Sequence, residues 1–278
     1  MIQLGRFNTL TIVRFTDHGA YVDGGEVGEI LVPKAYVRPE MRPGDVLDLF
    51  VYLDQQERLV ATTEQPLAQA GEFAYLNVAW VNEHGAFLHW GVMKDLFVPF
   101  REQKRTMEQD RSYIVYIYVD EETQRLAATA KINRYIREAS PHEYHRGQEV
   151  DLLVWQRTEL GLKVIVDNAY SGLIYNDGLY GEEPRTGDRI RGTIVEVRPD
   201  GRLDISLQRL GKGRFRDFAE TLFDELQQAG GFLPFTDKSD ADDIAERFAV
   251  SKKTFKRAVG TLYRERKIKL SDDGIRLA

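Results

Sequence analysis

The sequence contains no cysteine among its 278 residues, which excludes disulfide bonds, thiolate metal sites and a cysteine nucleophile. It has no apolar run near the roughly 20 residues that a membrane-spanning helix needs. Residues 1–10 also lack the basic cluster and hydrophobic stretch of a secretory signal. We therefore expect a cytoplasmic protein with no membrane association.

The sequence also lacks the motifs that place a catalytic group in a defined context. It contains no phosphate-binding loop, no Gly-x-Ser-x-Gly nucleophile elbow and no His-Glu-x-x-His zinc motif. An acidic run that includes Asp242 and Asp243 is explained more simply by helix capping and the helix dipole than by a bound metal. We therefore expect no enzymatic activity, cofactor, metal ion or small-molecule substrate.

Charge is unevenly distributed along the chain. In total 38 basic side chains stand against 44 acidic ones, which gives a net charge of -6. Residues 1–213 hold 25 basic and 32 acidic side chains, whereas residues 214–278 hold 13 and 12. The acidic total argues against general adhesion to a polyanion. It does not exclude a nucleic-acid partner, because local fields govern binding.

Three segments of the chain repeat the same order of short motifs. A His-Gly-Ala-aromatic run begins at His18 and again at His84, and an Arg-Leu-x-Ala-Thr run begins at Arg58 and again at Arg125. Corresponding residues of these two copies lie 66 or 67 positions apart, and a degenerate third copy follows after a further 76 to 77. Each copy consists of short alternating runs bounded by glycine, proline and aspartate, which is typical of β-strands.

The length and pattern of each copy indicate a small barrel. About five short strands in roughly 60 residues suit an OB fold, whose closure removes most of the sheet edges. The predicted domains are residues 1–65, residues 71–130 and the degenerate residues 145–209. Because the connecting segments are not rich in glycine and serine, we expect packed modules rather than freely tethered ones.

The remaining residues, 214–278, have a different pattern. Apolar residues recur there at helical spacing in three successive runs, followed by two short strand patterns around Asp272. Ser251 is the expected N-cap of the third helix. Helix, helix, turn, helix and hairpin is the order of a winged helix-turn-helix. The predicted fold is therefore mainly β, with three tandem OB-fold barrels followed by an α+β winged-helix domain.

The repeated segments resemble the S1 RNA-binding domain, a variety of the OB fold. The resemblance rests on the His-Gly-Ala-Tyr/Phe run, the Leu-Val-Pro-like strand after it, Gly-Asp, and the closing Asp…Arg-Leu-x-x-Thr/Ser run. Together with the winged-helix pattern and residues 251–263, these segments resemble the bacterial conserved virulence factor B family over nearly the whole chain. The resemblance implies a cytoplasmic, non-enzymatic RNA-binding protein that acts in the control of gene expression and virulence.

Alternation along one strand of each S1-like copy predicts outward aromatic rings. If the two flanking residues point into the barrel, Tyr21 points out, and the same holds for Phe87 in the second copy. An outward ring on an OB sheet can stack on a base. His18 and His84 lie where S1 domains usually carry phenylalanine and would extend the stacking surface. The alternative is that these rings pack against a neighbouring module.

The third copy has Lys163 in place of the outward ring. It carries Tyr175 on the next strand, where the first two copies have Pro33 and Pro99. Either Lys163 contacts phosphate and Tyr175 stacks on a base, or this module is purely structural.

Four basic side chains lie opposite the apolar face of the third helix predicted in the tail. They are Lys253, Lys256, Arg257 and Arg264. In a winged helix this helix enters a nucleic-acid groove, so the four are predicted phosphate contacts. A run of charges is also typical of a solvated helix face.

The sequence therefore predicts a protein that binds single-stranded RNA through several weak sites on one chain. Two alternatives stay open. One is a DNA-binding transcriptional regulator that reads duplex through the winged helix. The other is a structural adaptor whose sheets bind protein partners. The sequence makes no prediction of oligomeric state.

Overall fold

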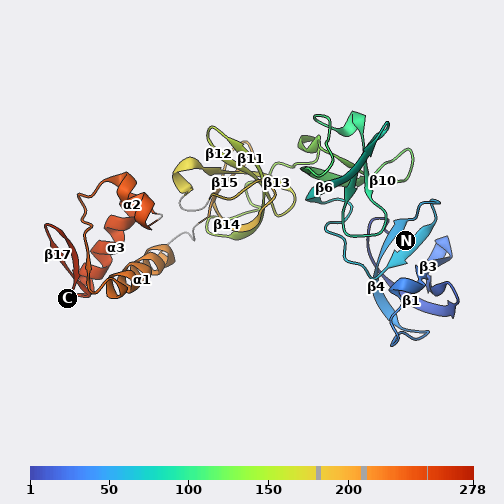
Figure 1. Cartoon of the computed structure of the whole chain (residues 1–278), viewed down its shortest axis with the longest axis horizontal. Coiled ribbons are helices and arrows are strands. Elements are labelled where there is room, and N and C mark those ends of the chain that lie inside the picture. Colours follow the sequence, from blue (N-terminus) through green and yellow to red (C-terminus); the bar gives the residue numbers. More distant parts are fainter. Residues whose placement is uncertain (180–182, 208–211, 249) are drawn as a thin grey trace. The chain divides into compact units, whose positions relative to one another are not determined.

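The computed structural model describes residues 1–179, 183–207, 212–248 and 250–278. The chain divides into two compact units, residues 1–136 and residues 137–278. Three closed five-stranded barrels and a C-terminal helical domain follow one another along the sequence (Figure 1). This confirms the expected fold class, which is mainly β with an α+β winged-helix domain at the end.

The first two barrels have the same strand order. The first contains β1 (Arg6–Thr16), β2 (Gly19–Asp23), β3 (Glu29–Pro33), β4 (Val46–Leu53) and β5 (Leu59–Thr62). The second contains β6 (Phe73–Asn82), β7 (Gly85–His89), β8 (Leu96–Pro99), β9 (Ser112–Val119) and β10 (Leu126–Thr129). In both, the first strand pairs with the second and fourth, and the third pairs in parallel with the fifth.

The third barrel repeats this topology although its sequence is the most divergent. Its strands are β11 (Glu149–Thr158), β12 (Gly161–Val166), β13 (Tyr170–Tyr175), β14 (Arg189–Val197) and β15 (Leu203–Ser206). They close in the order β11-β12-β13-β15-β14. The predicted end of this module, residue 209, lies outside the described residues.

One glycine recurs at the start of the second strand of every barrel. Gly19, Gly85 and Gly161 have φ values of 144°, 159° and 151°. A Cβ atom at any of them would overlap a carbonyl oxygen of the third strand. Only glycine fits so close to the facing backbone, which explains the glycine of the repeated His-Gly-Ala motif.

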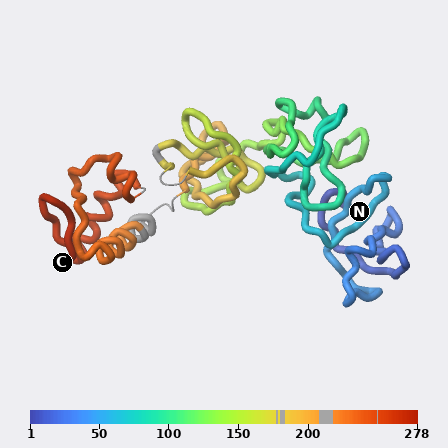
Figure 2. The backbone as a smooth tube through the Cα atoms, in the orientation of Figure 1, coloured from blue at the N-terminus to red at the C-terminus, as the bar shows by residue number. Residues whose placement is uncertain are grey.

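Strand β4 buries both of its faces. Leu49 and Val51 belong to the core of the first barrel, whereas Phe50 and Tyr52 point outward and belong to the core of the second. The Phe50 ring lies edge-on to Trp90, with 5.4 Å between the ring centroids. In Figure 2 the blue and green lobes of the tube are these two barrels. They share apolar packing, in agreement with the packed arrangement expected from the connecting segment.

The corresponding outward face of β9 is covered in a different way. Tyr116 stacks on Tyr135, with 4.0 Å between the ring centroids and 18° between the planes. Tyr135 directly follows a single 3-10 turn, Ile132–Arg134, after the second barrel. The same outward position therefore contacts a neighbouring barrel in the first copy and the following segment in the second.

The last domain is a three-helix winged helix. It contains α1 (Lys212–Gln228), β16 (Phe232–Leu233), α2 (Ala241–Phe248), α3 (Lys252–Arg264), β17 (Ile268–Ser271) and β18 (Gly274–Leu277), with the sheet in the order β16-β18-β17. The Ser251 Oγ accepts a hydrogen bond from the Thr254 N–H at 3.2 Å. Ser251 is therefore the N-cap of α3, as predicted.

Two features are absent from residues 1–179, 183–207, 212–248 and 250–278. Among these residues, no helix combines the length and the apolar character that crossing a membrane requires. The same residues contain no cluster of three or more His, Cys, Asp or Glu that could hold a metal ion.

The shared core makes a prediction about stability. Phe50→Ala removes a fully buried ring between two barrels and should destabilise residues 1–136 by about 3 to 5 kcal/mol. Tyr116→Ala is the matched control, because it removes the ring at the same repeat position, where it is only half-buried. Urea unfolding of the full chain, followed by tryptophan fluorescence, measures both. Equal losses for the two variants would contradict the shared core.

Candidate nucleic-acid interface

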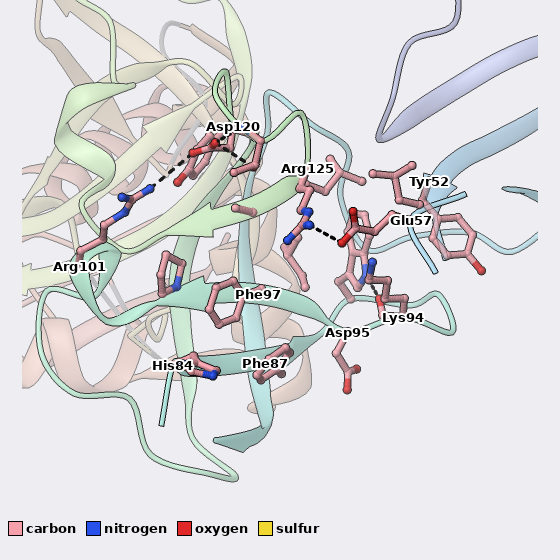
Figure 3. A pocket seen from close by; sticks show the side chains of 18 residues that line it. Tyr52, Glu57, His84, Phe87, Lys94, Asp95, Phe97, Arg101, Asp120 and Arg125 are labelled. Atoms are coloured by element: carbon pink, nitrogen blue, oxygen red, sulfur yellow. Dashed lines mark hydrogen bonds and ion pairs between the residues drawn. The ribbon is translucent and has the colours of Figure 1, made fainter. Parts of the chain in front are cut away.

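Strands β2 and β7 place the two predicted stacking rings on the outside of their barrels. Both neighbours of each ring are fully buried, whereas Tyr21 and Phe87 are half-buried. His18 and His84 are exposed in the turns that precede these strands. His84 and Phe87 line one cavity (Figure 3). The structure thus brings these two predicted residues together.

In the second barrel Phe87 is the middle ring of a row of three. The indole of Trp80 on β6 lies parallel to it, with 3.7 Å between the centroids and 3° between the planes. The ring of Phe97 on β8 lies on the next strand, 4.9 Å from Phe87 and at 37°. In the strand register Trp80 faces Phe87, and Phe87 faces Phe97. The row therefore crosses three neighbouring strands of the barrel.

In the first barrel a cation occupies the position of Trp80. Arg14 on β1 faces Tyr21 in the strand register, and its guanidinium carbon lies 4.2 Å from the ring centroid. The residue that faces Tyr21 on β3 is Leu31. The first barrel therefore has a guanidinium over one ring, where the second has three rings.

A β-bulge explains why the alternation pattern missed Trp80 and Arg14. Val78 and Ile12 are core residues, so strict alternation would send the side chains two positions later inward as well. The register shifts between Val78 and Trp80, and between Ile12 and Arg14. The extra residue redirects the next side chain to the outer surface. The sequence does contain a signal for these residues. Trp80 and Arg14 each lie four positions before the histidine of the repeated His-Gly-Ala motif.

The third barrel pairs its two predicted residues with other partners. Lys163 is exposed, and its ammonium lies 5.4 Å from the ring of Trp155, an aromatic that the sequence comparison missed. The guanidinium of Arg198 lies 5.7 Å from the Tyr175 centroid. Arg198 also forms an ion pair with Asp204 at 2.8 Å. Burial raises the pKa of Asp204, and Arg198 acts in the opposite direction.

A cavity of about 610 Å³ opens within residues 1–136 (Figure 3). Phe87 and Phe97 line it from the second barrel, and Tyr52 and Glu57 line it from the first. Clefts that bind small ligands measure about 300 to 1,000 Å³. The cavity is therefore large enough for one nucleotide, and its apolar wall includes two rings of the aromatic row, Phe87 and Phe97.

Cations that line this cavity each have an oxygen partner. The pairs are Arg125 with Glu57, Arg101 with Asp120 at 3.7 Å, and Lys94 with the carbonyl oxygen of Asp54 at 2.8 Å. Burial lowers the pKa of Lys94. Hydrogen bonds from the backbone and hydroxyl of Thr123 hold the pKa of Asp120 below its usual value. A phosphate that enters the cavity would compete with these acids for the two arginines.

Helix α3 presents all four predicted basic residues to solvent. Lys253, Lys256, Arg257 and Arg264 are exposed. Phe255 and Leu262 on the other side of the helix are buried in the core of the domain. Tyr263, beside Arg264, is 54% exposed. The helix therefore offers basic groups and one aromatic ring on its outer surface.

Three closed barrels of OB topology and a winged helix define a modular protein built from folds that bind nucleic acids in many proteins. Family models match almost the whole chain. Residues 4–64 and 70–131 match the S1 domain. Residues 136–209 match the second domain of virulence regulatory factor CvfB, and residues 220–277 match the CvfB-like winged helix domain.

Known proteins resemble the chain over most of its length. It is 31% identical over 273 residues to the uncharacterized protein YitL of Bacillus subtilis, covering 95% of this chain and 90% of that protein. It is 25% identical over 244 residues to conserved virulence factor B of Staphylococcus saprophyticus, covering 86% and 81%. The chain belongs to the conserved virulence factor B family, as its motifs predicted.

The match between this chain and one solved structure extends over almost the whole of both proteins. It is the crystal structure of a multidomain protein with nucleic acid binding domains from Streptococcus pneumoniae. That protein is 24% identical to this chain, with coverage of 99% of this chain and 98% of its own, and the TM-score is 0.43.

Proposed function

We propose that this protein binds single-stranded RNA through its S1-type barrels and its winged helix, and that it regulates gene expression after transcription. It would act in the cytoplasm and without enzymatic activity. The observation that carries the proposal is the outward aromatic site at the same register of two barrels, at Tyr21 and Phe87. Base stacking on aromatic side chains is worth about 1 to 3 kcal/mol per base and tolerates any sequence.

The mechanism is binding by several weak sites on one chain. Because the first two barrels share a core, binding at one barrel places the strand near the other. The second contact then becomes intramolecular, and the overall affinity exceeds that of either site. The basic side chains of α3 add phosphate contacts, which carry no sequence information. Low sequence specificity and a strong dependence on salt follow.

A second candidate is a transcriptional regulator that reads duplex DNA. The exposed basic face of α3 favours it, because the third helix of a winged helix is the one that enters the major groove. The aromatic row of the second barrel favours a single strand over a duplex, because stacking needs unpaired bases. A third candidate is a structural adaptor whose outward rings bind protein partners.

Competition separates these candidates. We expect a labelled single-stranded RNA of mixed sequence to bind the full chain, with binding measured by fluorescence anisotropy. Unlabelled single-stranded RNA should displace it at a far lower concentration than duplex DNA of equal length. Displacement by duplex DNA at the same concentration would favour the transcriptional regulator. Failure to bind any nucleic acid would favour the adaptor.

The α3 lysines should affect how binding depends on salt. Each phosphate contact on a single strand contributes about 0.7 to the slope of log affinity against log salt. The double change Lys253→Ala, Lys256→Ala should therefore weaken binding and lower the slope by about 1.4. Lys238→Ala is the control, because Lys238 is an exposed lysine of the same domain outside α3. An unchanged slope in the double variant would contradict phosphate contact by α3.

The ion pair in the cavity should oppose phosphate binding. Glu57→Gln removes the carboxylate that pairs with Arg125. We expect this change to tighten RNA binding by about 1.5- to 5-fold, the range of an exposed ion pair. Glu40→Gln, at an exposed carboxylate of the same barrel, is the control for net charge. Equal effects of the two variants in the anisotropy assay would mean that Arg125 does not contact phosphate.

A further inference from the structure

Trp80 and Arg14 occupy the same place in the first two barrels and are held there in the same way. The indole Nε1–H of Trp80 donates a hydrogen bond to Asp95 at 3.0 Å. The guanidinium of Arg14 donates to both carboxylate oxygens of Glu29, at distances of 2.6 to 3.2 Å. In each barrel a planar side chain of the first strand is thus hydrogen-bonded to an acid at the start of the third strand or directly before it.

The two acids have the same position in the strand register. Glu29 directly precedes Ile30, and Asp95 directly precedes Leu96. Ile30 and Leu96 each pair with the fourth residue of the second strand of their barrel. The two copies therefore build the same contact across three strands with different side chains. The shared feature of the two barrels is therefore the arrangement of acid, planar group and ring, and not one residue type.

The third barrel has other residues at these positions. Gln156 faces Lys163 in the register, and Ser171 stands where the acid stands in the first two copies. Lys163 contacts Trp155 of the bulge instead. The arrangement of acid, planar group and ring is thus a property of the two barrels within residues 1–136.

Trp80 and Arg14 are more accessible than the rings beside them on the second strand. Trp80 is 42% exposed and the Arg14 side chain is 49% exposed, whereas Phe87 and Tyr21 are half-buried. Phe87 also has two ring neighbours, one on each adjacent strand. A base that approaches the barrel can therefore reach the exposed part of the indole or the guanidinium.

Both groups have the chemistry to stack on a base. An aromatic ring and a guanidinium plane each stack on unpaired bases. The hydrogen bonds to the acids hold these planes in place before binding, so less side-chain entropy is lost when a base arrives. Glu29 also neutralises Arg14, so the plane of the guanidinium matters more for binding than its charge.

We propose that bases stack on Trp80 and Arg14, and that Phe87 and Tyr21 support these side chains from the neighbouring strand. Asp95 and Glu29 are positioning residues, because they orient the stacking groups. The inference rests on the proposed binding of single-stranded nucleic acid and names the side chains that touch the strand.

Alanine substitution on β6 tests the stacking surface. Labelled oligouridine is the probe, because its bases are unpaired, and anisotropy with the full chain gives the affinity. Trp80→Ala should weaken binding by about 5-fold or more, which corresponds to the loss of one stacked base. Tyr75→Ala is the matched control, because Tyr75 is an aromatic of the same strand with a similar exposure of 40%. We expect it to change the affinity by less than about 2-fold.

Tryptophan fluorescence provides a readout that does not depend on affinity. A base stacked on Trp80 should quench its emission. Trp90 is buried, with 2% exposure, and the half-buried Trp155 is present in both chains that are compared. The quenching at saturating oligouridine should be smaller in Trp80→Phe than in the parent chain. This comparison holds even if Trp80→Ala lowers the melting temperature, because Trp80→Phe retains a ring against Phe87.

The positioning role of Asp95 has its own test. Asp95→Ala removes the acceptor and should reduce both the affinity and the quenching. Asp95→Asn keeps an acceptor oxygen and should restore most of both. A purely structural role would change the melting temperature and leave the quenching at saturation unchanged.

The outcomes separate this inference from the proposed function. If Trp80→Ala and Tyr75→Ala weaken oligouridine binding equally, and Trp80→Phe loses no quenching, the inference is overturned. The proposed function would still stand. Failure of the parent chain to bind oligouridine or mixed RNA would overturn both.

Discussion

The burial of β4 on both of its faces is the constraint on which residues 1–136 depend. A barrel of about 60 residues buries little apolar surface and is marginal alone. Phe50 and Tyr52 point away from the first barrel and complete the core of the second, where Phe50 meets Trp90. The two barrels therefore stabilise each other, and the two stacking sites belong to one body. Binding at one site raises the effective concentration of the strand at the other.

Each stacking site depends in turn on a local departure from regular strand geometry. A β-bulge places Trp80 and Arg14 opposite the outward rings, where regular alternation would have sent them into the core. An acid at the start of the third strand, or directly before it, then fixes each planar group by hydrogen bonds. The surface offered to a base is therefore ordered before binding, which lowers the entropic cost of weak contacts.

The sequence predicts the architecture well because repetition and periodicity are local properties. The glycine at Gly19, Gly85 and Gly161 marks the same close approach of two strands in every copy, so the repeat could be found even in the divergent third barrel. The N-cap at Ser251 and the outward direction of the four α3 basic residues also follow from local rules.

The composition of the stacking sites could not be predicted in the same way. Trp80 reaches the surface because of a bulge, and a bulge has no reliable sequence signature. The ion pair between Arg125 and Glu57 joins residues of different repeats. The position of Phe97 beside Phe87 depends on strand register rather than on spacing. Each of these features is a tertiary contact, and periodicity within one strand contains no information about it.

The most direct test of this account is a map of the bound strand on the protein. Nuclear magnetic resonance titration of the full chain with oligouridine would record shifts of the indole and backbone N–H groups. We predict the largest shifts at the Trp80 indole and along β6 to β8, with further shifts around Arg14. Shifts confined to α3, with those strands unchanged, would contradict the claim that the first two barrels bind unpaired bases.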